Sequence, residues 1–466
     1  MKFGLRTVAF AIPSLLVSIA ALLACGFIQA PFNIHQPLSN LMNDFQLGLI
    51  PLLLLGCTRA IYAFEENSYI TVRSMDWSDP NMSLSLWASP SGKSRVGANN
   101  NSHDNPLKWE SKYASLVVCN YGKGTTDGMN EKGLVINLHF LPDADYGEPN
   151  KDPQGKPNLA VSGWGQYVLD KFATVAEAVE DLKKQTFTIV TDHIPFLVKD
   201  KNGGYQNEPK KIVVHLGISD ASGDSAILQY VKVDEKSQLN IYHHRNYKVM
   251  TNSPYNRQLE ILEKLTDQSQ DEERKWNKDK IENFDWDALT RKDLNGDIVK
   301  EMTPPMNGAD IRYIRASFFS DNIEKITEPR IFLEEETQEF FKGEWSYEEA
   351  IARAFSLIRN MSTPLNVKSL DNPFLSSTIW RTVADQKNKR YFLETARTLY
   401  PIYVDLPELF KSIRDKTHKL VVFEPPKVKG GESTDLQQEQ KDNKKIGKVN
   451  EYFQPTEEDW FDFDPL

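Results

Sequence analysis

The stretch LLLLGCTRAIYAFEENSYITVRSMDW, residues 52–77, decides how the folded part of the chain begins. An apolar run ends in Gly, Cys57 follows, and two segments rich in β-branched and aromatic residues surround the polar turn EENS. Such a pattern predicts a β-hairpin. In an antiparallel hairpin centred near residue 66, position 57 faces about position 75, because paired positions sum to a constant. We therefore expect Arg73 and Asp76 to lie beside Cys57.

The composition limits the class of protein. The chain has 466 residues, of which 40% are hydrophobic, enough for a large buried core. Its net charge of -10 and the lack of a basic stripe in the sequence predict no nucleic-acid partner. The three cysteines, Cys25, Cys57 and Cys119, exclude a disulfide scaffold and a Cys-rich zinc site. Cys119 lies in an apolar strand pattern, where a buried and unreactive cysteine is expected.

Two apolar segments precede Cys57. Residues 1–30 have a positive start and a long uncharged apolar run, typical of a signal peptide or a membrane anchor. The second run, 47–56, is too short to span a membrane. Cys25 lies within the first run and Cys57 directly follows the second, each in a context similar to a lipidation site. We expect residues 1–56 to be removed and the protein to be exported to the periplasm or beyond, with the membrane reached only through this segment.

Beyond the hairpin, the pattern predicts many antiparallel strands interrupted by pairs of helices. Strands and helices do not alternate regularly, as they would around a parallel sheet, so the sequence predicts an α+β layered fold. The expected strands are 114–119, 134–140, 212–219, 225–233, 239–242, 247–251, 376–384 and 390–394. The expected helices are 162–172, 175–184, one after Pro254, and 346–358, and DGMNEKG at 127–133 is expected as a turn.

Two charged regions interrupt or follow this pattern. Residues 266–300 carry mixed charges and predict a solvated helical insertion. Residues 424–466 are rich in Lys, Gln, Glu, Gly and Asp, which predicts a disordered acidic tail. The expected organisation is a removed segment at 1–56, a catalytic domain at 57–423 and this tail.

Five motifs in the same order resemble the choloylglycine hydrolase family, which includes penicillin V acylases and bile salt hydrolases. The resemblance covers about residues 57–405. It implies the fold of the N-terminal nucleophile hydrolases, a four-layer αββα sandwich with antiparallel sheets, and a homo-oligomer, a tetramer in this family. The motifs are CT at 57–58, RSMDW at 73–77, DGMNEKGL at 127–134, MTNSP at 250–254 and IRYIRA at 311–316.

The resemblance assigns catalytic roles to five positions. Cys57 matches the nucleophile, and Arg73 and Asp76 match the pair that flanks it. Asn252 matches the side chain of the oxyanion hole, and Arg312 matches the cation near the thiol.

Three more residues are implied at the substrate. The family's second oxyanion donor is a backbone N–H, which falls near Phe140, where bile salt hydrolases usually carry Asn and Gram-positive penicillin V acylases Tyr. Trp77 and His139 are expected to contact the substrate. The run NLHFL at 137–141 is more similar to exported Gram-negative acylases, a subgroup associated with penicillin V and long-chain acyl-homoserine lactones.

The chemistry that follows is hydrolysis of a linear amide in an N-acyl small molecule. A thiol and an α-amine ionise near pH 8–9 and near pH 8 respectively when unperturbed, so the amine of an N-terminal Cys57 can act as base for its own thiol. Asp76 would orient that amine, and Asn252 would stabilise the oxyanion. No metal or cofactor is expected.

Other readings stay open. Cys57 alone is more typical of a buried or lipidated cysteine than of a nucleophile. Arg73 with Asp76 is also typical of a structural ion pair, and Asn252 before Ser-Pro of a helix cap. The alternatives are a bile salt or fatty-acid amide hydrolase with the same mechanism, or a membrane-tethered lipoprotein without catalysis.

Overall fold

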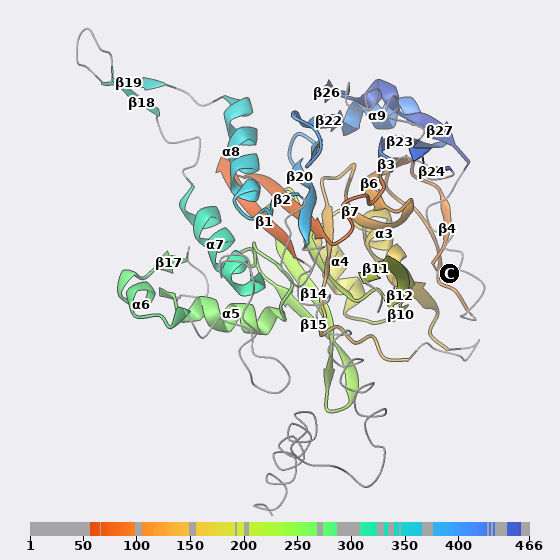
Figure 1. The fold of residues 1–466 in the computed structure, drawn as a ribbon, viewed down its shortest axis with the longest axis horizontal. Coiled ribbons are helices and arrows are strands. Elements are labelled where there is room, and N and C mark those ends of the chain that lie inside the picture. The colour runs from red at the N-terminus through yellow and green to blue at the C-terminus, as the bar shows by residue number, and fades with distance from the viewer. Residues whose placement is uncertain are drawn as a thin grey trace, which may run out of the picture. The chain divides into compact units, whose positions relative to one another are not determined.

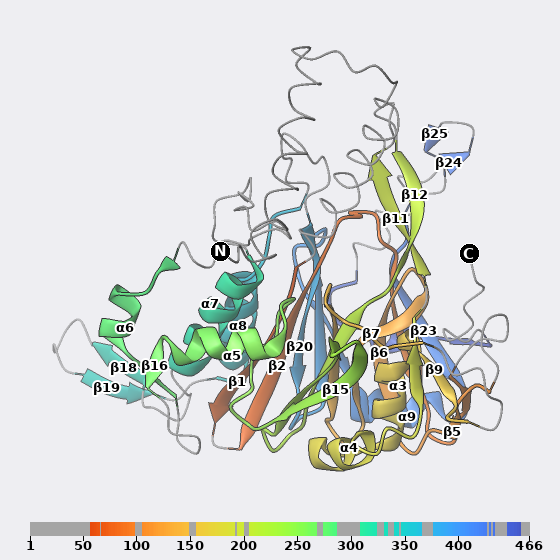
Figure 2. The ribbon, with the colours of Figure 1, turned by 90° about the horizontal axis from the view of Figure 1, so that it is seen from below.

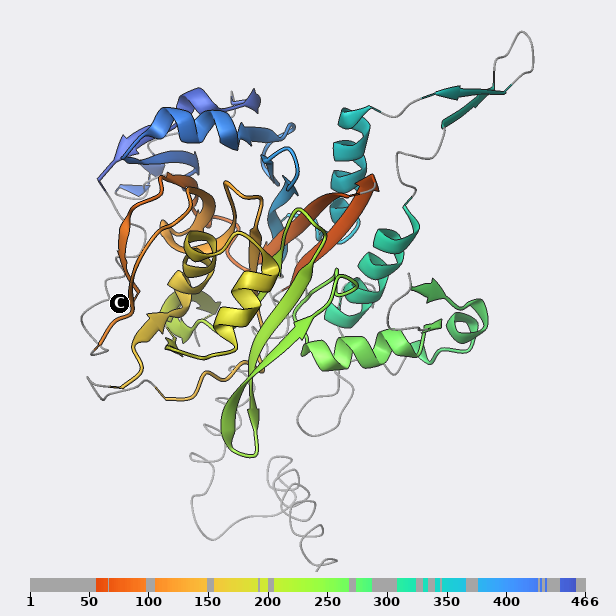
Figure 3. The same cartoon turned by 180° about the vertical axis from the view of Figure 1, so that it is seen from behind.

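The computed structural model describes residues 56–65, 67–97, 105–148, 155–191, 193–199, 205–267, 274–286, 308–323, 330–333, 340–343, 346–365, 376–425, 428–429, 432–433 and 445–457. All of them belong to one of the two compact units of the chain, residues 54–466. Figure 1 shows this unit from one side and Figure 3 from behind.

The predicted hairpin is present in the predicted register. Strands β1 (Cys57–Glu65) and β2 (Ser68–Trp77) pair antiparallel, and Cys57 faces Met75 directly. The register shifts once, between Ala63 and Glu65, close to the turn. The hairpin forms because every second side chain of β1 and β2 enters an apolar core while the intervening ones face the second sheet.

The hairpin is one edge of a six-stranded sheet. The strand order is β1-β2-β20-β21-β22-β26, antiparallel except for the last pair. Its other strands are β20 (Ser377–Asp385), β21 (Arg390–Thr395), β22 (Ile402–Asp405) and β26 (Gly447–Lys448).

A nine-stranded antiparallel sheet packs against it. The order is β15-β14-β13-β8-β7-β6-β3-β23-β27. These strands are β3 (Leu84–Ser89), β6 (Ser115–Asn120), β7 (Lys123–Asn130), β8 (Val135–Phe140), β13 (Val214–Ser219), β14 (Ser225–Val233), β15 (Lys236–His243), β23 (Thr417–Phe423) and β27 (Gln454–Thr456).

Helices cover the outer faces of both sheets, as Figure 2 shows. Helices α3 (Val161–Lys171) and α4 (Val175–Leu182) pack on the nine-stranded sheet, with Trp164 and Val168 fully buried. Helices α5 (Tyr255–Glu263), α7 (Ala309–Asn322) and α8 (Tyr347–Arg359) form the layer on the six-stranded sheet. The layers therefore run helix, sheet, sheet, helix, which confirms the predicted αββα sandwich.

The remaining elements are short. Helix α9 (Leu406–Ile413) lies by β22 and β3, and α6 (Lys278–Glu282) lies near α5. A short 3-10 helix η3 (Asn450–Tyr452) and six two-stranded pairs complete the described elements: β4 (Ser94–Val96) with β5 (Lys108–Glu110), β9 (Asn158–Ala160) with β10 (Thr188–Val190), β11 (His193–Lys199) with β12 (Tyr205–Lys211), β16 (Thr266–Asp267) with β17 (Lys275–Trp276), β18 (Arg330–Leu333) with β19 (Phe340–Gly343), and β24 (Val428–Lys429) with β25 (Glu432–Ser433).

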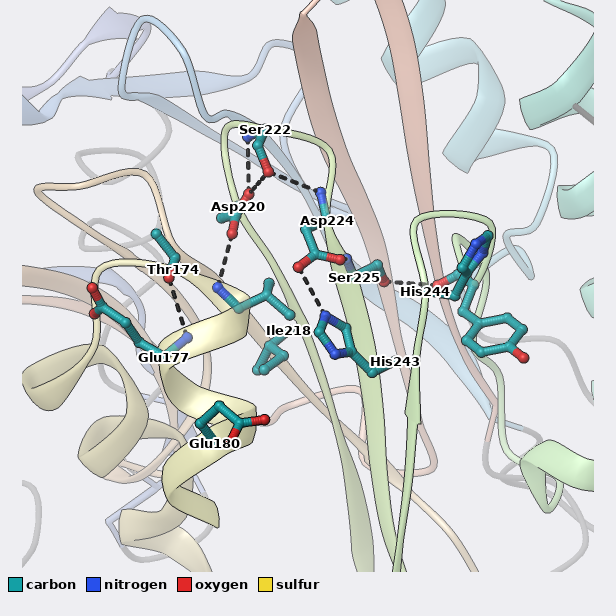
Figure 4. A network of polar contacts seen from close by, with 12 residues as sticks. Thr174, Glu177, Glu180, Ile218, Asp220, Ser222, Asp224, Ser225, His243 and His244 are labelled. Carbon is teal, nitrogen blue, oxygen red and sulfur yellow. Dashed lines mark hydrogen bonds and ion pairs between the residues drawn. The ribbon is translucent and has the colours of Figure 1, made fainter. Parts of the chain in front are cut away.

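The turn between β13 and β14 ties three layers together (Figure 4). Asp220 accepts a hydrogen bond from the main-chain N–H of Val175 at 2.8 Å and so caps α4 from 45 residues away. Its other carboxylate oxygen accepts from Ser222. Gly223 has a φ of +81°, and a Cβ there would lie 2.4 Å from the ring of Tyr69 on β2. The turn therefore presses against the first hairpin and needs glycine at that position.

The space between the two sheets is largely polar, unlike the two outer cores. Arg59 reaches across it and donates to Asn137 Oδ1, to Ser225 Oγ and to the carbonyl of Ile218. Thr71 bonds Ser219 across the same space. Buried charges need such partners, and here they lock the sheets in one relative position.

Two local expectations were wrong. Residues 127–130 are not a turn but the end of β7, because Asp127 and Asn130 find buried partners that outweigh their turn preference. Residues 247–251 form no strand; they make a single bridge, between Met250 and Arg59.

The expected disordered tail is also wrong for residues 445–457. Strand β26 extends the six-stranded sheet and β27 the nine-stranded one, while Val449 and Phe453 are buried. Composition predicted solvation for this segment, but a few apolar residues spaced among the charges are enough to dock it. The rest of 434–466 lies outside the described residues.

The expected insertion at 266–300 is described only in part. Trp276 and Ile281 pack against Ile261 and Ile314, so this part rests on α5 and α7 and is not a free helix. Residues 287–300 lie outside the described ranges, as do residues 1–55 with the two apolar runs. Among the helices that are described, none has the length and apolarity to cross a bilayer. The domain boundaries proposed from the sequence stay a prediction.

Candidate active site

Cys57 is the first residue of β1 and is almost fully buried, with 2% of its surface exposed. Its thiol lies 3.8 Å from Nη2 of Arg73 and 3.7 Å from Sδ of Met75. Met75 is the residue paired with Cys57 across the hairpin, and Arg73 lies two residues along on the same face of β2. The hairpin alone therefore brings the predicted cation to the thiol.

The guanidinium of Arg73 is fixed by groups from the opposite sheet. Nη1 donates to the carbonyl of Thr126 at 2.8 Å, and Nη2 donates to the carbonyl of Leu138 at 2.9 Å. From the same sheet as Arg73, the ring of Trp380 on β20 lies with its centroid 4.6 Å from Cζ of Arg73. Nη1 also lies 3.4 Å from Asp127. With its cation held in this way, the site stabilises a thiolate without a mobile side chain.

The main-chain nitrogen of Cys57 meets Asn252, a contact that the sequence did not predict, since Asn252 was expected only in the oxyanion hole. It donates to Oδ1 of Asn252 at 2.5 Å, and Nδ2 of Asn252 donates to the carbonyl of Phe140 at 2.7 Å. Asn252 is no helix cap, because α5 begins after Pro254 and has no side-chain cap. One hydrogen of Nδ2 is engaged by Phe140, so an oxyanion would take the second.

Arg312 lies at the main chain of the nucleophile. From α7, its Nη1 donates to the carbonyl of Cys57 at 2.6 Å and to Thr58 Oγ1 at 2.7 Å, while Nη2 donates to Asn252 Oδ1 at 3.0 Å. The expectation placed this cation near the thiol; its contacts instead connect Cys57 to Asn252. Arg312 therefore orients the backbone on which the thiol and amine are carried.

Asp76 lies on the amine side of Cys57. A Cβ built on Gly56 would be 3.1 Å from Asp76 Oδ2 and 2.8 Å from Arg312 Nη2, so both side chains flank the peptide that precedes Cys57. Thr378 donates to Asp76 Oδ1 at 2.6 Å. Burial raises the pKa of Asp76 to about 6, against the opposing effects of Arg312, Thr378, Arg381 and Arg73.

The three predicted substrate residues lie in different settings. The side chain of Phe140 is buried, and its carbonyl holds Asn252. Trp77 is 7% exposed and donates to the hydroxyl of Tyr121. His139 is fully buried between the sheets, and its Nδ1 lies 3.3 Å from the carbonyl of Thr251. Burial and the charge of Arg73 hold the pKa of His139 well below its usual value, so the ring is neutral.

A second histidine contacts the carbonyl of Thr251 together with His139, and the sequence did not suggest it. His215, which faces it across β8 and β13, bonds the same Thr251 carbonyl through Nε2 at 2.8 Å. Thr251 immediately precedes Asn252. The two imidazoles therefore act on the placement of Asn252 from within the protein, and in this structure His139 presents no surface to a substrate.

Asp127 and Thr378 were also missed. Asp127 belongs to a motif that had been interpreted as a turn, and Thr378 becomes a neighbour of Asp76 only through the pairing of β2 with β20.

Within the described ranges, no three His, Cys, Asp or Glu side chains gather as metal ligands would. The chemistry available here is that of a thiol, a guanidinium, a carboxylate and an amide.

An αββα sandwich with a cysteine at the start of a strand in one of its two sheets is the architecture of the N-terminal nucleophile hydrolases. Residues 57–409 match the model of the linear amide C–N hydrolases, choloylglycine hydrolase family. The match begins at Cys57 and covers most of the chain. The chain belongs to the choloylglycine hydrolase family, and it is a hydrolase of carbon–nitrogen bonds other than peptide bonds in linear amides.

Individual relatives agree with this assignment. The chain is 36% identical over 365 residues to a penicillin V acylase of Pectobacterium atrosepticum, covering 76% of this chain and 82% of that protein. The solved structure of penicillin V acylase from Agrobacterium tumefaciens is 32% identical, with a TM-score of 0.58, over 86% of this chain and 98% of that one. A variant of conjugated bile acid hydrolase from Clostridium perfringens is 19% identical with a TM-score of 0.51, over 81% and 100%, and supports the fold alone.

Proposed function

We propose that the mature protein begins at Cys57 and hydrolyses N-acyl amides such as penicillin V or acyl-homoserine lactones, with the Cys57 thiol as nucleophile and its own α-amine as base. The observation that carries this proposal is the double environment of Cys57. Its sulfur lies against Arg73, while its nitrogen lies against Asn252, with Asp76 close by. A buried cysteine with a purely structural role needs neither.

The proposed reaction moves one proton at each stage. The amine of Cys57 takes the proton of the thiol, and the thiolate adds to the acyl carbon of the substrate. Nδ2 of Asn252 and the backbone N–H near Phe140 would stabilise the oxyanion, each by a few kcal/mol. The ammonium gives its proton to the leaving nitrogen, so the C–N bond breaks and a thioester forms. Water, deprotonated by the same amine, then releases the acid and restores the thiol.

Maturation is a requirement of this mechanism. While Gly56 is attached, the nitrogen of Cys57 belongs to a peptide bond and is no base. Its N–H already points at Asn252, so the same nitrogen, once freed, has an acceptor and a carboxylate in place. Removal of 1–56 therefore needs no large rearrangement of the described residues. If Cys57→Ala still loses residues 1–56, a signal peptidase cuts there. If Cys57→Ala retains them, the protein itself makes the cut.

A substrate panel tests the proposed activity. Purified mature protein is incubated with penicillin V, a long-chain acyl-homoserine lactone, a glycine-conjugated bile salt and a fatty-acid amide, and the released amine is measured. We expect hydrolysis of one of the first two, and its complete loss in Cys57→Ala. Cys119→Ala is the matched control, because Cys119 is buried in the outer core and its loss lowers stability without touching the site. Hydrolysis that survives in Cys57→Ala refutes the proposal.

The bile salt candidate has one observation in its favour. The chain is 30% identical over 161 residues to a protein named bile salt hydrolase/transferase from Clostridium perfringens, but this covers only 32% of the chain. The longer match to penicillin V acylases favours the first two substrates. Membership of a hydrolase family also argues against a lipoprotein without catalysis.

Export to the periplasm or beyond and assembly into a tetramer belong to the same proposal. The apolar run at 8–28 after a positive start supports export, as it would in a secretory signal. Cell fractionation checks the export, and light scattering of the purified protein checks the tetramer.

A further inference from the structure

Asp127 stands directly behind Arg73 in the layer between the sheets. Its side chain is fully buried, and Arg73 Nη1 lies 3.4 Å from its Oδ2. The opposite end of the guanidinium meets the thiol of Cys57. Two successive contacts through the guanidinium of Arg73 therefore connect Asp127 on β7 to the Cys57 thiol.

Three other groups donate to Asp127. Tyr391 Oη donates to Oδ1 at 2.5 Å, Asn137 Nδ2 to Oδ2 at 2.7 Å, and Thr382 Oγ1 lies 3.4 Å from Oδ2. Every one of these contacts is donated to the carboxylate. In a protonated carboxyl, one oxygen would carry a hydrogen and accept fewer hydrogen bonds. An arrangement in which every neighbour donates therefore fits the ionised form of Asp127. Burial raises the pKa of Asp127, and Arg73, Tyr391 and Asn137 oppose this rise.

We propose that Asp127 is a positioning residue for the reaction: it fixes the guanidinium of Arg73 against the Cys57 thiol and offsets part of its charge. This inference rests on the proposed role of Cys57 as nucleophile. Without Asp127, the full charge of Arg73 would favour the thiolate more strongly and make it a weaker nucleophile. With Asp127 present, the thiol keeps a proton that the neighbouring amine can take.

The other charged groups near the thiol act in both directions. Asp76 opposes the thiolate and Arg312 favours it, and His139 is neutral. Asp127→Asn keeps the size of the side chain and replaces none of these groups. The charged groups around Cys57 are Arg73 and Asp76 on β2 and Arg312 on α7. Asp127 on β7 and His139 on β8 interact with Arg73 from the opposite sheet.

The test compares Asp127→Asn with Asp170→Asn in the mature protein. Asp170 is also fully buried and also accepts from an arginine, Arg95, at 3.3 Å, but it lies on α3, outside the layer between the sheets. Thiolate absorbance at 240 nm is titrated against pH, with Cys57→Ser as the blank. We expect Asp127→Asn to lower the midpoint by about half a unit or more and to reduce kcat several-fold at an unchanged KM. Asp170→Asn should lose stability and leave the midpoint in place.

An unchanged midpoint in Asp127→Asn, or an equal shift in Asp170→Asn, overturns the proposal. If Asp127→Asn fails to fold, Tyr391→Phe decides, because it removes one restraint on the carboxylate and keeps its charge. A several-fold fall in kcat at constant KM supports positioning, and an unchanged kcat overturns it. Failure of the proposed function would look different: Cys57→Ala would keep its activity, while the thiol titration would still report on Asp127.

Discussion

Replacing Thr378 by Val should move the acid limb of activity to higher pH. The hydroxyl of Thr378 donates to Asp76 Oδ1 at 2.6 Å in a fully buried setting, and it holds the pKa of Asp76 down against burial. A hydrogen bond to a charged group contributes roughly 1.5–3 kcal/mol, and one pKa unit corresponds to about 1.4 kcal/mol. Loss of the hydroxyl should therefore raise the pKa of Asp76 by about one unit.

The sign follows from the role of the carboxylate. Ionised Asp76 orients the amine of Cys57, so activity falls again, below the pH at which that amine is protonated, as pH passes through the pKa of Asp76, which is about 6 with the peptide bond intact. The ammonium of the mature chain lowers that pKa in the wild type and in the variant alike. The difference between their acid limbs is therefore the quantity to read.

The assay is the pH dependence of kcat/KM for the best substrate of the panel, measured from pH 4 to 9. Thr378→Ser is the matched control, because it keeps the hydroxyl and should leave the acid limb within about 0.3 unit of the wild type. The main-chain N–H of Thr363 also donates to this hydroxyl, so Thr378→Val should lose on the order of 1–3 kcal/mol of stability as well. If the folded Thr378→Val protein keeps the acid limb of kcat/KM at the wild-type pH, the role given to Asp76 is refuted.

Three further outcomes follow from the same contacts. Gly223→Ala should cost on the order of 1–3 kcal/mol in chemical denaturation, since the new Cβ meets the ring of Tyr69 at a positive φ; a loss below about 0.5 kcal/mol would count against the packing described. Gly56→Ala should reduce the fraction of purified protein that begins at Cys57, because its methyl group displaces Arg312; intact mass gives that fraction, and an unchanged value contradicts the expectation. In protein that retains Gly56, stability should fall as pH rises from about 4 to 6, because the raised pKa of the native Asp76 carboxyl makes its ionisation costly, and Asp76→Asn should remove this fall; denaturation at several pH values shows it, and equal slopes in both proteins would speak against a buried charge.

The hairpin register could be predicted because it depends on local sequence alone. The turn fixes the pairing, and the pairing brings Arg73 and Met75 to the thiol of Cys57. Asn252 was assigned to the site through the family resemblance, but its contact with the nitrogen of Cys57 was not predicted, since 195 residues separate the two and no local rule connects such positions.

The supporting residues could not be predicted in this way. Thr378 reaches Asp76 only because β20 pairs with β2, and Asp127 reaches Arg73 only because the two sheets stack. Their residue types give no signal, as Thr is common in strands and Asp in turns. The docked segment around Phe453 was missed for a related reason: composition averages over residues, while two strands need only a few well-placed ones.

The central claim is that Cys57 carries a free amine and a reactive thiol. It is tested most directly by mass spectrometry of the amino-terminal peptide of the active protein, before and after brief exposure to substrate followed by acid quenching. We predict an unmodified peptide that begins at Cys57, and a fraction of it that gains the mass of the acyl group on the thiol. A peptide that retains Gly56, or a diacylglycerol on Cys57, in fully active protein would contradict it.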